Sequence, residues 1–329
     1  MGQRHRLARL LALVGGALAA YSAYAWYAMR RLEDLEPQSA GAPGSFLDVD
    51  GVRIHYVEAG QGPPVVLIHG WNASAFSFRY TIPELARDHR VVALDLKGYG
   101  YSDRPAEGDY SLATQAELVQ RVMDRLGIDR ADVIGHSMGG AVAMRLAVQH
   151  PELVSRVVLV DSVTMAEFRH AIRFGRLLKP LLPLAAPLAL HRDRVGRAVF
   201  RTAVHDPAHL TPEVLEGYFR PLRMKGHLRA LARQLVDRRQ DKLVDPARIW
   251  QPTLILWGEH DRWLPLVHGE TLARQIPNAK LAVVRGSGHL PLEEQPATCN
   301  QLLLEFLNLP EEAGEPAQKE AAAKLETAI

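Results

Sequence analysis

Short apolar segments alternate with amphipathic segments along most of this chain. The apolar segments have the length and the β-branched residues of buried strands, and they cover residues 52–58, 64–68, 91–94, 133–134, 157–160, 253–257 and 281–284. Segments with helical periodicity lie between and after them, at residues 112–126, 138–149 and 298–307. Such alternation predicts an α/β fold with a mostly parallel sheet and helices on both faces.

The alternation is interrupted once, at residues 164–248, where helical periodicity is broken by several prolines and no strand pattern occurs. We predict a helical cap there, inserted into an α/β core formed by residues 46–163 and 249–309. The last residues, 310–329, are polar and rich in alanine, which is typical of a tail without packed structure.

Arginines bracket an uncharged N-terminal stretch, residues 10–29. As a helix, a stretch of this length spans about 30 Å, the thickness of the hydrocarbon core of a bilayer. Residues 1–31 are therefore predicted to be a membrane anchor, followed by a linker over residues 32–45, with the rest of the chain on the extracytoplasmic side. Ala23-Tyr24-Ala25 resembles a cleavage site, so a cleaved signal peptide and a secreted or periplasmic protein are the alternative.

Composition excludes several function classes. Hydrophobic residues make up 47% of the chain and charged residues 23%, which is ordinary for a globular protein. A net charge of +2 does not indicate a nucleic-acid partner. Cys299 is the only cysteine, so no intrachain disulfide can form, and a thiol nucleophile or a cysteine zinc site is not expected. We expect Cys299 to be a small core residue.

The strongest chemical signal is Gly135-His136-Ser137-Met138-Gly139, which lies where a strand pattern changes directly into a helix pattern. A serine at such a turn adopts a strained backbone conformation, and the flanking glycines avoid collisions with the strand and the helix. Its hydroxyl is then exposed at the end of the sheet. We predict that Ser137 is a nucleophile and that the Met138 amide faces a developing oxyanion.

A serine hydroxyl is a poor nucleophile until a base removes its proton. His289 lies in a glycine-rich loop directly after the last strand pattern, so its side chain can reach back over the strand ends. We therefore predict His289 as the base.

The base needs a carboxylate on its other nitrogen, which fixes the tautomer and stabilises the imidazolium. Asp261 follows the strand pattern 253–257 and is the predicted acid. Asp161 and Glu259 remain as alternatives, because Asp161 ends an earlier strand pattern and Glu259 shares the loop of Asp261.

The second oxyanion donor is expected from the loop after residues 64–68, which reads His69-Gly70-Trp71. Gly70 allows a sharp turn, and the backbone amide of Trp71 would face that of Met138. The Trp71 indole can shape a pocket at the same time. Chemistry of this kind needs neither a metal nor an organic cofactor.

These motifs resemble the α/β-hydrolase superfamily over roughly residues 46–308, as do the segments DLKGYGYS at 95–102, WGEHDRWLP at 257–265 and GSGHLPLEEQP at 286–296. The resemblance implies an eight-stranded, mostly parallel sheet with the cap over the active site. The His-Gly-Trp loop is similar to that of epoxide hydrolases and haloalkane dehalogenases. Those families use an aspartate at the elbow, so Ser137 argues against both activities.

Three functions remain from the sequence. The first is an esterase or lipase that acts on a small-molecule or lipid ester with an apolar acyl group, on the resemblance to membrane-anchored monoacylglycerol lipases. The second is a hydrolase of carbon–carbon bonds in ring-cleavage products; proline iminopeptidases and cofactor-free perhydrolases share the triad as well. The third is a catalytically silent, membrane-tethered binding module, which intact Ser137, Asp261 and His289 disfavour. Nothing in the sequence identifies a protein partner.

Overall fold

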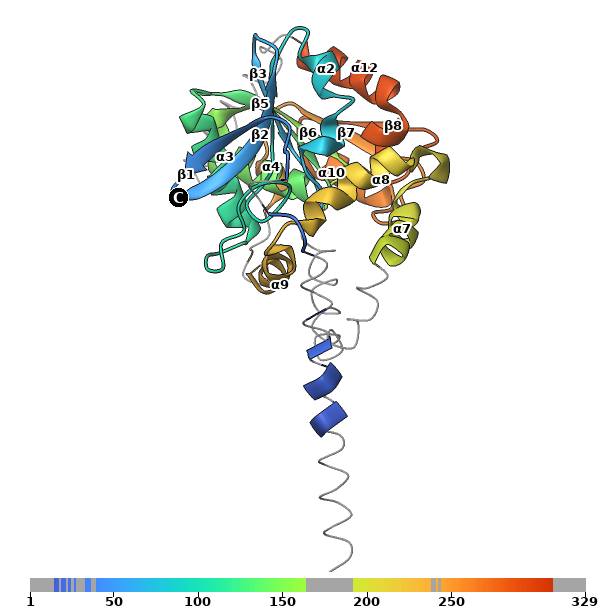
Figure 1. Ribbon diagram of the computed structural model, residues 1–329. Helices are drawn as coiled ribbons and strands as arrows, with labels where there is room; N and C mark the ends of the chain where they lie inside the picture. Colours follow the sequence, from blue (N-terminus) through green and yellow to red (C-terminus); the bar gives the residue numbers. More distant parts are fainter. Residues whose placement is uncertain are drawn as a thin grey trace, which may run out of the picture.

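The computed structural model describes residues 15–17, 19–21, 23, 24, 27, 33–36, 40–163, 192–237, 241 and 244–309. Its centre is one eight-stranded sheet with the strand order β1-β2-β4-β3-β5-β6-β7-β8 (Figure 1). The strands are β1 (Ser45–Val49), β2 (Val52–Ala59), β3 (Pro64–Ile68), β4 (Arg90–Leu94), β5 (Ala131–His136), β6 (Val154–Val160), β7 (Thr253–Gly258) and β8 (Ala279–Val284). β2 is antiparallel to both of its neighbours, and the remaining pairs are parallel.

Helices cover both faces of the sheet. They are α2 (Ile82–Leu85), α3 (Leu112–Arg125), α4 (Met138–Gln149), α7 (Arg192–Ala203), α8 (Pro212–Phe219), α9 (His227–Asp237), α10 (Val267–Gln275), α11 (Pro291–Glu294) and α12 (Pro296–Leu307). One apolar core lies between the sheet and α3, α4 and α10, and a second lies between the opposite face and α2 and α12. The predicted α/β fold class and the eight-stranded sheet are confirmed.

The two cores explain why the central strands are continuous apolar runs. Neighbouring residues of β3 alternate between them: Val66 and Ile68 belong to one core, and Val65 and Leu67 to the other. A strand that is buried on both faces has no solvent side, so polar alternation is not required. Because β3 and β5 to β8 are parallel, their carboxyl ends meet at one edge of the sheet.

Helices α7, α8 and α9 come from the segment predicted as a cap, and we call residues 192–237 the inserted helices. They contact the sheet's carboxyl edge: the His289 amide donates to the Ala203 carbonyl at 2.6 Å, and the Glu294 carboxylate accepts from the His205 amide at 2.7 Å. The domain boundaries stay predictions. The first part of the predicted cap, residues 164–191, and the predicted tail, residues 310–329, lie outside the described residues.

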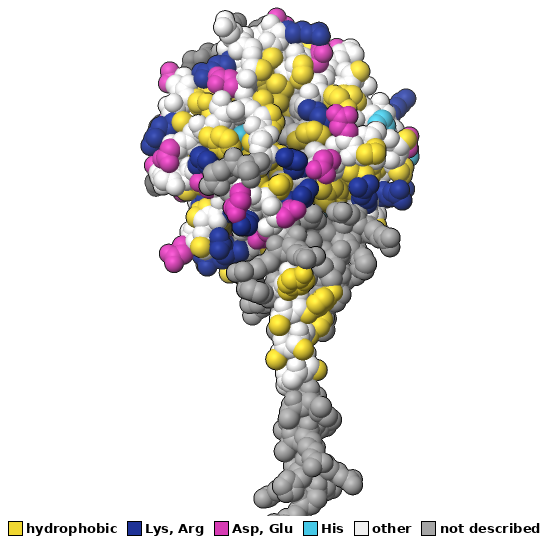
Figure 2. Space-filling model, viewed as in Figure 1, with side chains coloured by type: hydrophobic (Ala, Val, Ile, Leu, Met, Phe, Trp, Pro, Cys, Tyr) yellow, Lys and Arg dark blue, Asp and Glu magenta, His cyan; other side chains and the backbone are white. Residues whose placement is uncertain are grey.

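Part of the predicted linker is ordered against the inserted helices. Leu35 forms a β-bridge with Met224, and the Glu33 carboxylate accepts hydrogen bonds from the amides of Gly226 and Leu228. On the face drawn in Figure 2, Lys and Arg side chains are interspersed with Asp and Glu. That face therefore carries no concentrated basic area of the kind that binds nucleic acid.

The predicted membrane anchor is corrected by the structure. Within the part of the chain that is described, no helix combines the length and the apolar character needed to cross a membrane. This finding overturns the predicted membrane-anchored localisation. Most of residues 1–31, on which the anchor and the signal-peptide alternative were based, lie outside the described residues.

The reactivity of Cys299 tests the packing of the second core. Burial raises the pKa of the Cys299 thiol to about 12, and this residue lies on the face of α12 that packs into the second core. We expect Cys299 to react with Ellman's reagent at pH 8 over minutes only after unfolding in denaturant, because the thiolate is the reactive form. The stoichiometry should then be one thiol per chain, and Cys299→Ser should give none. Rapid labelling of the folded protein would contradict this packing of α12.

Candidate active site

Ser137 occupies the sharp turn between β5 and α4. Its backbone angles are φ +52° and ψ −115°, a conformation that L-residues rarely adopt. The turn is very tight: a Cβ atom on Gly139 would lie 2.0 Å from the Ile68 carbonyl oxygen, and one on Gly135 would lie 2.4 Å from the Gly139 carbonyl oxygen. The Ser137 amide also donates to the Val160 carbonyl at 2.8 Å, so the neighbouring strand holds the turn in place.

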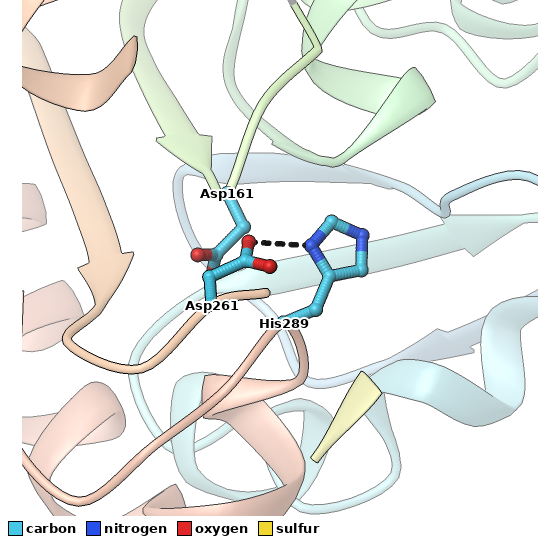
Figure 3. A group of neighbouring side chains, drawn as sticks. All are labelled: Asp161, Asp261 and His289. Carbon is cyan, nitrogen blue, oxygen red and sulfur yellow. Dashed lines mark hydrogen bonds and ion pairs between the residues drawn. The ribbon is translucent and has the colours of Figure 1, made fainter. Parts of the chain in front are cut away.

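The structure brings the three predicted catalytic side chains together. Nε2 of His289 lies 3.1 Å from Oγ of Ser137, and Nδ1 of His289 lies 2.7 Å from Oδ2 of Asp261 (Figure 3 shows the His289–Asp261 contact). An ionised carboxylate can only accept, so it assigns the His289 proton to Nδ1. Nε2 then faces the Ser137 hydroxyl as an acceptor, which is the arrangement a general base needs.

Asp261 is held as a carboxylate by several donors. Burial alone would raise its pKa, but the hydrogen bond and charge of His289 and the amide of Leu264 hold the pKa of Asp261 below its usual value. Oδ1 accepts from the amides of Trp263 at 2.7 Å and Leu264 at 2.9 Å. The predicted alternative Glu259 points elsewhere, because its carboxylate accepts from the Gly286 amide.

The other alternative acid, Asp161, lies in the site, but His289 bonds Asp261 instead. It directly follows β6, and its side chain lies beside Asp261 (Figure 3). Ligand atoms of Asp161, Asp261 and His289 all lie within 4.8 Å of one another. Nδ1 of His289 bonds Asp261, so Asp161 has a different role in the site.

The predicted oxyanion loop also lies at the nucleophile. A Cβ atom on Gly70 would lie 3.2 Å from Cβ of Ser137, so the loop after β3 touches the elbow. Met138 is the first residue of α4, where the positive end of the helix dipole favours a developing negative charge. Trp71 is 43% exposed. The oxyanion roles of the Trp71 and Met138 amides stay predictions.

His136 is a site residue that the sequence analysis did not assign. Its Nε2 lies 2.8 Å from the His289 carbonyl oxygen and must donate to it, and the two rings are 5.1 Å apart. Burial, with the nearby His289 charge, lowers the pKa of His136 to about 3. His136 is therefore a neutral hydrogen-bond donor that holds the histidine loop against the elbow. Its position beside Ser137 was the available signal.

Comparison with known proteins is consistent with this geometry. A family model described as the alpha/beta hydrolase fold matches residues 63–296. The chain belongs to the α/β-hydrolase fold family. It is therefore a hydrolase by family, and the α/β-hydrolase resemblance drawn from the motifs is confirmed.

Two relatives are similar to this chain over most of their length. This α/β hydrolase is 34% identical to the uncharacterized hydrolase YugF of Bacillus subtilis over 79% of this chain and 96% of the relative. It is 32% identical to a 2-hydroxymuconate semialdehyde hydrolase of Pseudomonas putida over 82% of this chain and 96% of the relative. The resemblance to membrane-anchored monoacylglycerol lipases is not confirmed.

Two solved structures share the fold at similar levels. The meta-cleavage product hydrolase CumD superposes with a TM-score of 0.67 at 27% identity, covering 80% of this chain and 98% of CumD. A membrane phospholipase A, described as a bacterial virulence factor, superposes with a TM-score of 0.68 at 27% identity, covering 92% of this chain and 96% of the phospholipase.

A second buried histidine–aspartate pair supports the loop after β3 in this α/β hydrolase. Asp95, directly after β4, contacts Nδ1 of His55 at 2.7 Å and accepts from the amides of Ala75 and Tyr101, each at 2.7 Å. The hydrogen bonds of His55 oppose the effect of its burial, so the pKa of His55 is raised. Asp95 thus ties β2 to the loops that follow β3 and β4. The sequence analysis placed Asp95 in a family motif without assigning it this role.

Asp161, Asp261 and His289 are, within the described ranges, the one group of histidines, cysteines and acids with the spacing to hold a metal. The site does not fit one well, because His289 Nδ1 and Asp261 Oδ2 bond each other and Asp261 Oδ1 is occupied by two amides. A metal would have to break the contact that orients the base.

The elbow conformation can be tested by removing the Ser137 hydroxyl in two ways. We expect Ser137→Gly to be more stable than Ser137→Ala by about 1 kcal/mol, because glycine tolerates positive φ and alanine does not. Denaturant unfolding measures the difference. Ala143→Gly in α4 is the control and should be destabilising, because its backbone is helical. Equal stabilities of the two Ser137 variants would contradict the strained turn.

The neutral state of His136 predicts a pH effect on stability. A histidine with a pKa of about 3 in the folded state and about 6.5 when unfolded destabilises the protein as the pH falls below about 6.5. At pH 5 the cost is about 2 kcal/mol. His136→Gln keeps a donor and cannot titrate, so it should lose that much less stability than the wild type between pH 7 and pH 5. Parallel unfolding curves would show that His136 accepts a proton when folded.

Proposed function

We propose that this protein hydrolyses its substrate through an acyl-enzyme on Ser137. The observation that carries the proposal is the unbroken hydrogen-bond chain from Ser137 through His289 to Asp261 at the carboxyl edge of the sheet. His289 takes the Ser137 proton as Oγ attacks a carbonyl carbon, and Asp261 stabilises the imidazolium that forms. The amides of Trp71 and Met138 receive the oxyanion.

His289 passes the proton on as acylation is completed, and then repeats both proton transfers with water. The imidazolium of His289 gives its proton to the leaving group as the tetrahedral intermediate collapses, which leaves the acyl group on Ser137. Water then attacks the acyl carbon while His289 takes its proton. Ser137 recovers its proton as the acid departs, so one water molecule is consumed and the protein is unchanged.

For the bond that is cleaved, we propose the carbon–carbon bond of a ring-cleavage product. Support comes from the relatives that act on such compounds, the 2-hydroxymuconate semialdehyde hydrolase and the meta-cleavage product hydrolase CumD. A carbon leaving group must depart as a stabilised carbanion, and conjugation to a second carbonyl in the substrate supplies that stabilisation. His289 is placed to protonate it. This was the alternative in the sequence analysis, where an ester was the leading prediction.

A carboxylic ester remains the second candidate. The supporting observation is the phospholipase A structure, because it matches 92% of this chain, a larger share than the CumD structure matches. The same acyl-enzyme serves both reactions, and the two differ only in whether carbon or oxygen leaves. The geometry at Ser137 therefore supports both, and the substrate test distinguishes them.

The test compares two substrate panels. We expect loss of the dienol absorbance of 2-hydroxymuconate semialdehyde analogues, with slower hydrolysis of p-nitrophenyl esters from acetyl to palmitoyl. Ser137→Ala should reduce kcat by about 10⁶-fold, and Asp261→Asn by about 10⁴-fold, because the latter allows the wrong histidine tautomer. Glu259→Gln, in the same loop as Asp261, is the matched control and should retain activity.

Three other outcomes would replace the carbon–carbon proposal. Faster cleavage of esters than of dienols would replace the carbon–carbon proposal with the ester candidate. A folded protein that hydrolyses neither and is not labelled by a fluorophosphonate probe would be a silent binding module. Labelling at Ser137 without activity on either panel would move the proposal to amide bonds.

A further inference from the structure

Asp161 is a second carboxyl group in the site that the proposed mechanism does not use. It directly follows β6 with a backbone φ of +40°, and its side chain is fully buried. An aspartate at positive φ is uncommon, so the surrounding contacts must hold it there. Figure 3 shows its carboxyl group beside that of Asp261, on the side away from the Ser137-facing nitrogen of His289.

The hydrogen bonds of the two carboxyl groups are unequal. Asp261 accepts from His289 on Oδ2 and from two backbone amides on Oδ1. Asp161 accepts from the Gly258 amide at 2.9 Å on Oδ1, while its buried Oδ2 accepts from no donor in the described part of the chain. A buried acceptor without a donor is costly. The cost disappears if Oδ2 carries a proton, since Asp261 lies within hydrogen-bonding reach as the acceptor.

The surrounding charges also favour a proton on Asp161. The titratable groups that face Asp161 are Asp261 on the loop after β7, His289 on the loop after β8, Glu294 on α11 and Cys299 on α12. Only His289 can become positive, and its Nδ1 already bonds Asp261. Burial first, and then the negative charge of Asp261, raise the pKa of Asp161 well above its usual value, despite the opposing Gly258 amide.

We propose that Asp161 is protonated in the working enzyme and donates a hydrogen bond from Oδ2 to the Asp261 carboxylate. Asp161 is then a positioning residue, because it acts on His289 only through Asp261. The donated bond fixes the rotation of the Asp261 carboxylate and withdraws electron density from it. This inference rests on the proposed roles of Asp261 and His289.

Deleting Asp161 should have opposite effects on His289, depending on whether Asp161 is protonated or charged. If Asp161 is a neutral donor, deleting it makes Asp261 a stronger acceptor and makes the His289 imidazolium harder to deprotonate. If Asp161 is instead a second negative charge, deleting it makes the imidazolium easier to deprotonate. The pH midpoint of nucleophile activation therefore separates the two states.

The experiment measures the rate of fluorophosphonate labelling of Ser137 against pH in the full chain. Asp161→Ala should shift the midpoint upward by about 0.5 pH unit or more and slow labelling at neutral pH. Asp161→Asn can accept from Gly258 and donate to Asp261, so it should return the midpoint to the wild-type value. A midpoint lowered by about 0.5 unit in Asp161→Asn would show that Asp161 is charged and would overturn the proposal.

A stability measurement keeps this inference separate from the proposed activity. A carboxyl whose pKa is raised by folding costs stability above its unfolded value of about 3.9, and the cost grows until the folded pKa is reached. Asp161→Asn removes it, so the Tm of Asp161→Asn minus that of the wild type should rise by about 3 °C or more from pH 5 to pH 8. A flat difference would overturn the protonated Asp161 even in an active enzyme. A rising difference in an inactive protein would instead refute only the proposed function.

Discussion

The site depends on the parallel pairing of the six strands β4-β3-β5-β6-β7-β8. This pairing gathers the carboxyl ends of strands that are far apart in sequence. Ser137 and His289 are separated by 152 residues and lie within hydrogen-bonding distance only through that register. The Ser137 turn is held by the same sheet, through the Val160 carbonyl of the neighbouring strand and the close approach of Gly139 to Ile68. A shift of one strand would therefore separate the nucleophile from the base. The chemistry is a property of the sheet edge rather than of any single loop.

Buried polar groups around the edge form layers of support. Asp261 orients His289, Asp161 lies behind Asp261, and His136 holds the His289 backbone. On the other side of the nucleophile, Asp95 fixes the loops after β3 and β4. The inserted helices join this network through the Ala203 carbonyl, which accepts from the His289 amide. The inserted helices therefore also help to hold the loop that carries His289.

Much of this was predictable from local patterns. The strand pattern 64–68 and the helix pattern 138–149 match β3 and α4 at both ends, because apolar runs and the glycine elbow are local signals. β1 was missed, although Asp50 and Gly51, both at positive φ, form the two-residue turn that pairs it with β2. The predicted membrane-anchored localisation was wrong, because no helix in the described part of the chain is both long enough and apolar enough to cross a membrane. The predictions were most accurate for elements with a regular pattern of buried apolar residues.

The sequence by itself determined the fold class and the residue types of the reaction: a serine at a strand–helix turn, a histidine and an aspartate, each after an apolar strand. Such signals are local, since each depends on a few neighbouring residues. Only the tertiary structure decided which acid meets His289, because Asp161, Glu259 and Asp261 all follow strands and differ in where their side chains point. It also decided that His136 is neutral and that Asp161 is buried against a second carboxyl. Burial and the distance between charges set these states, and both arise from contacts between segments far apart in the chain.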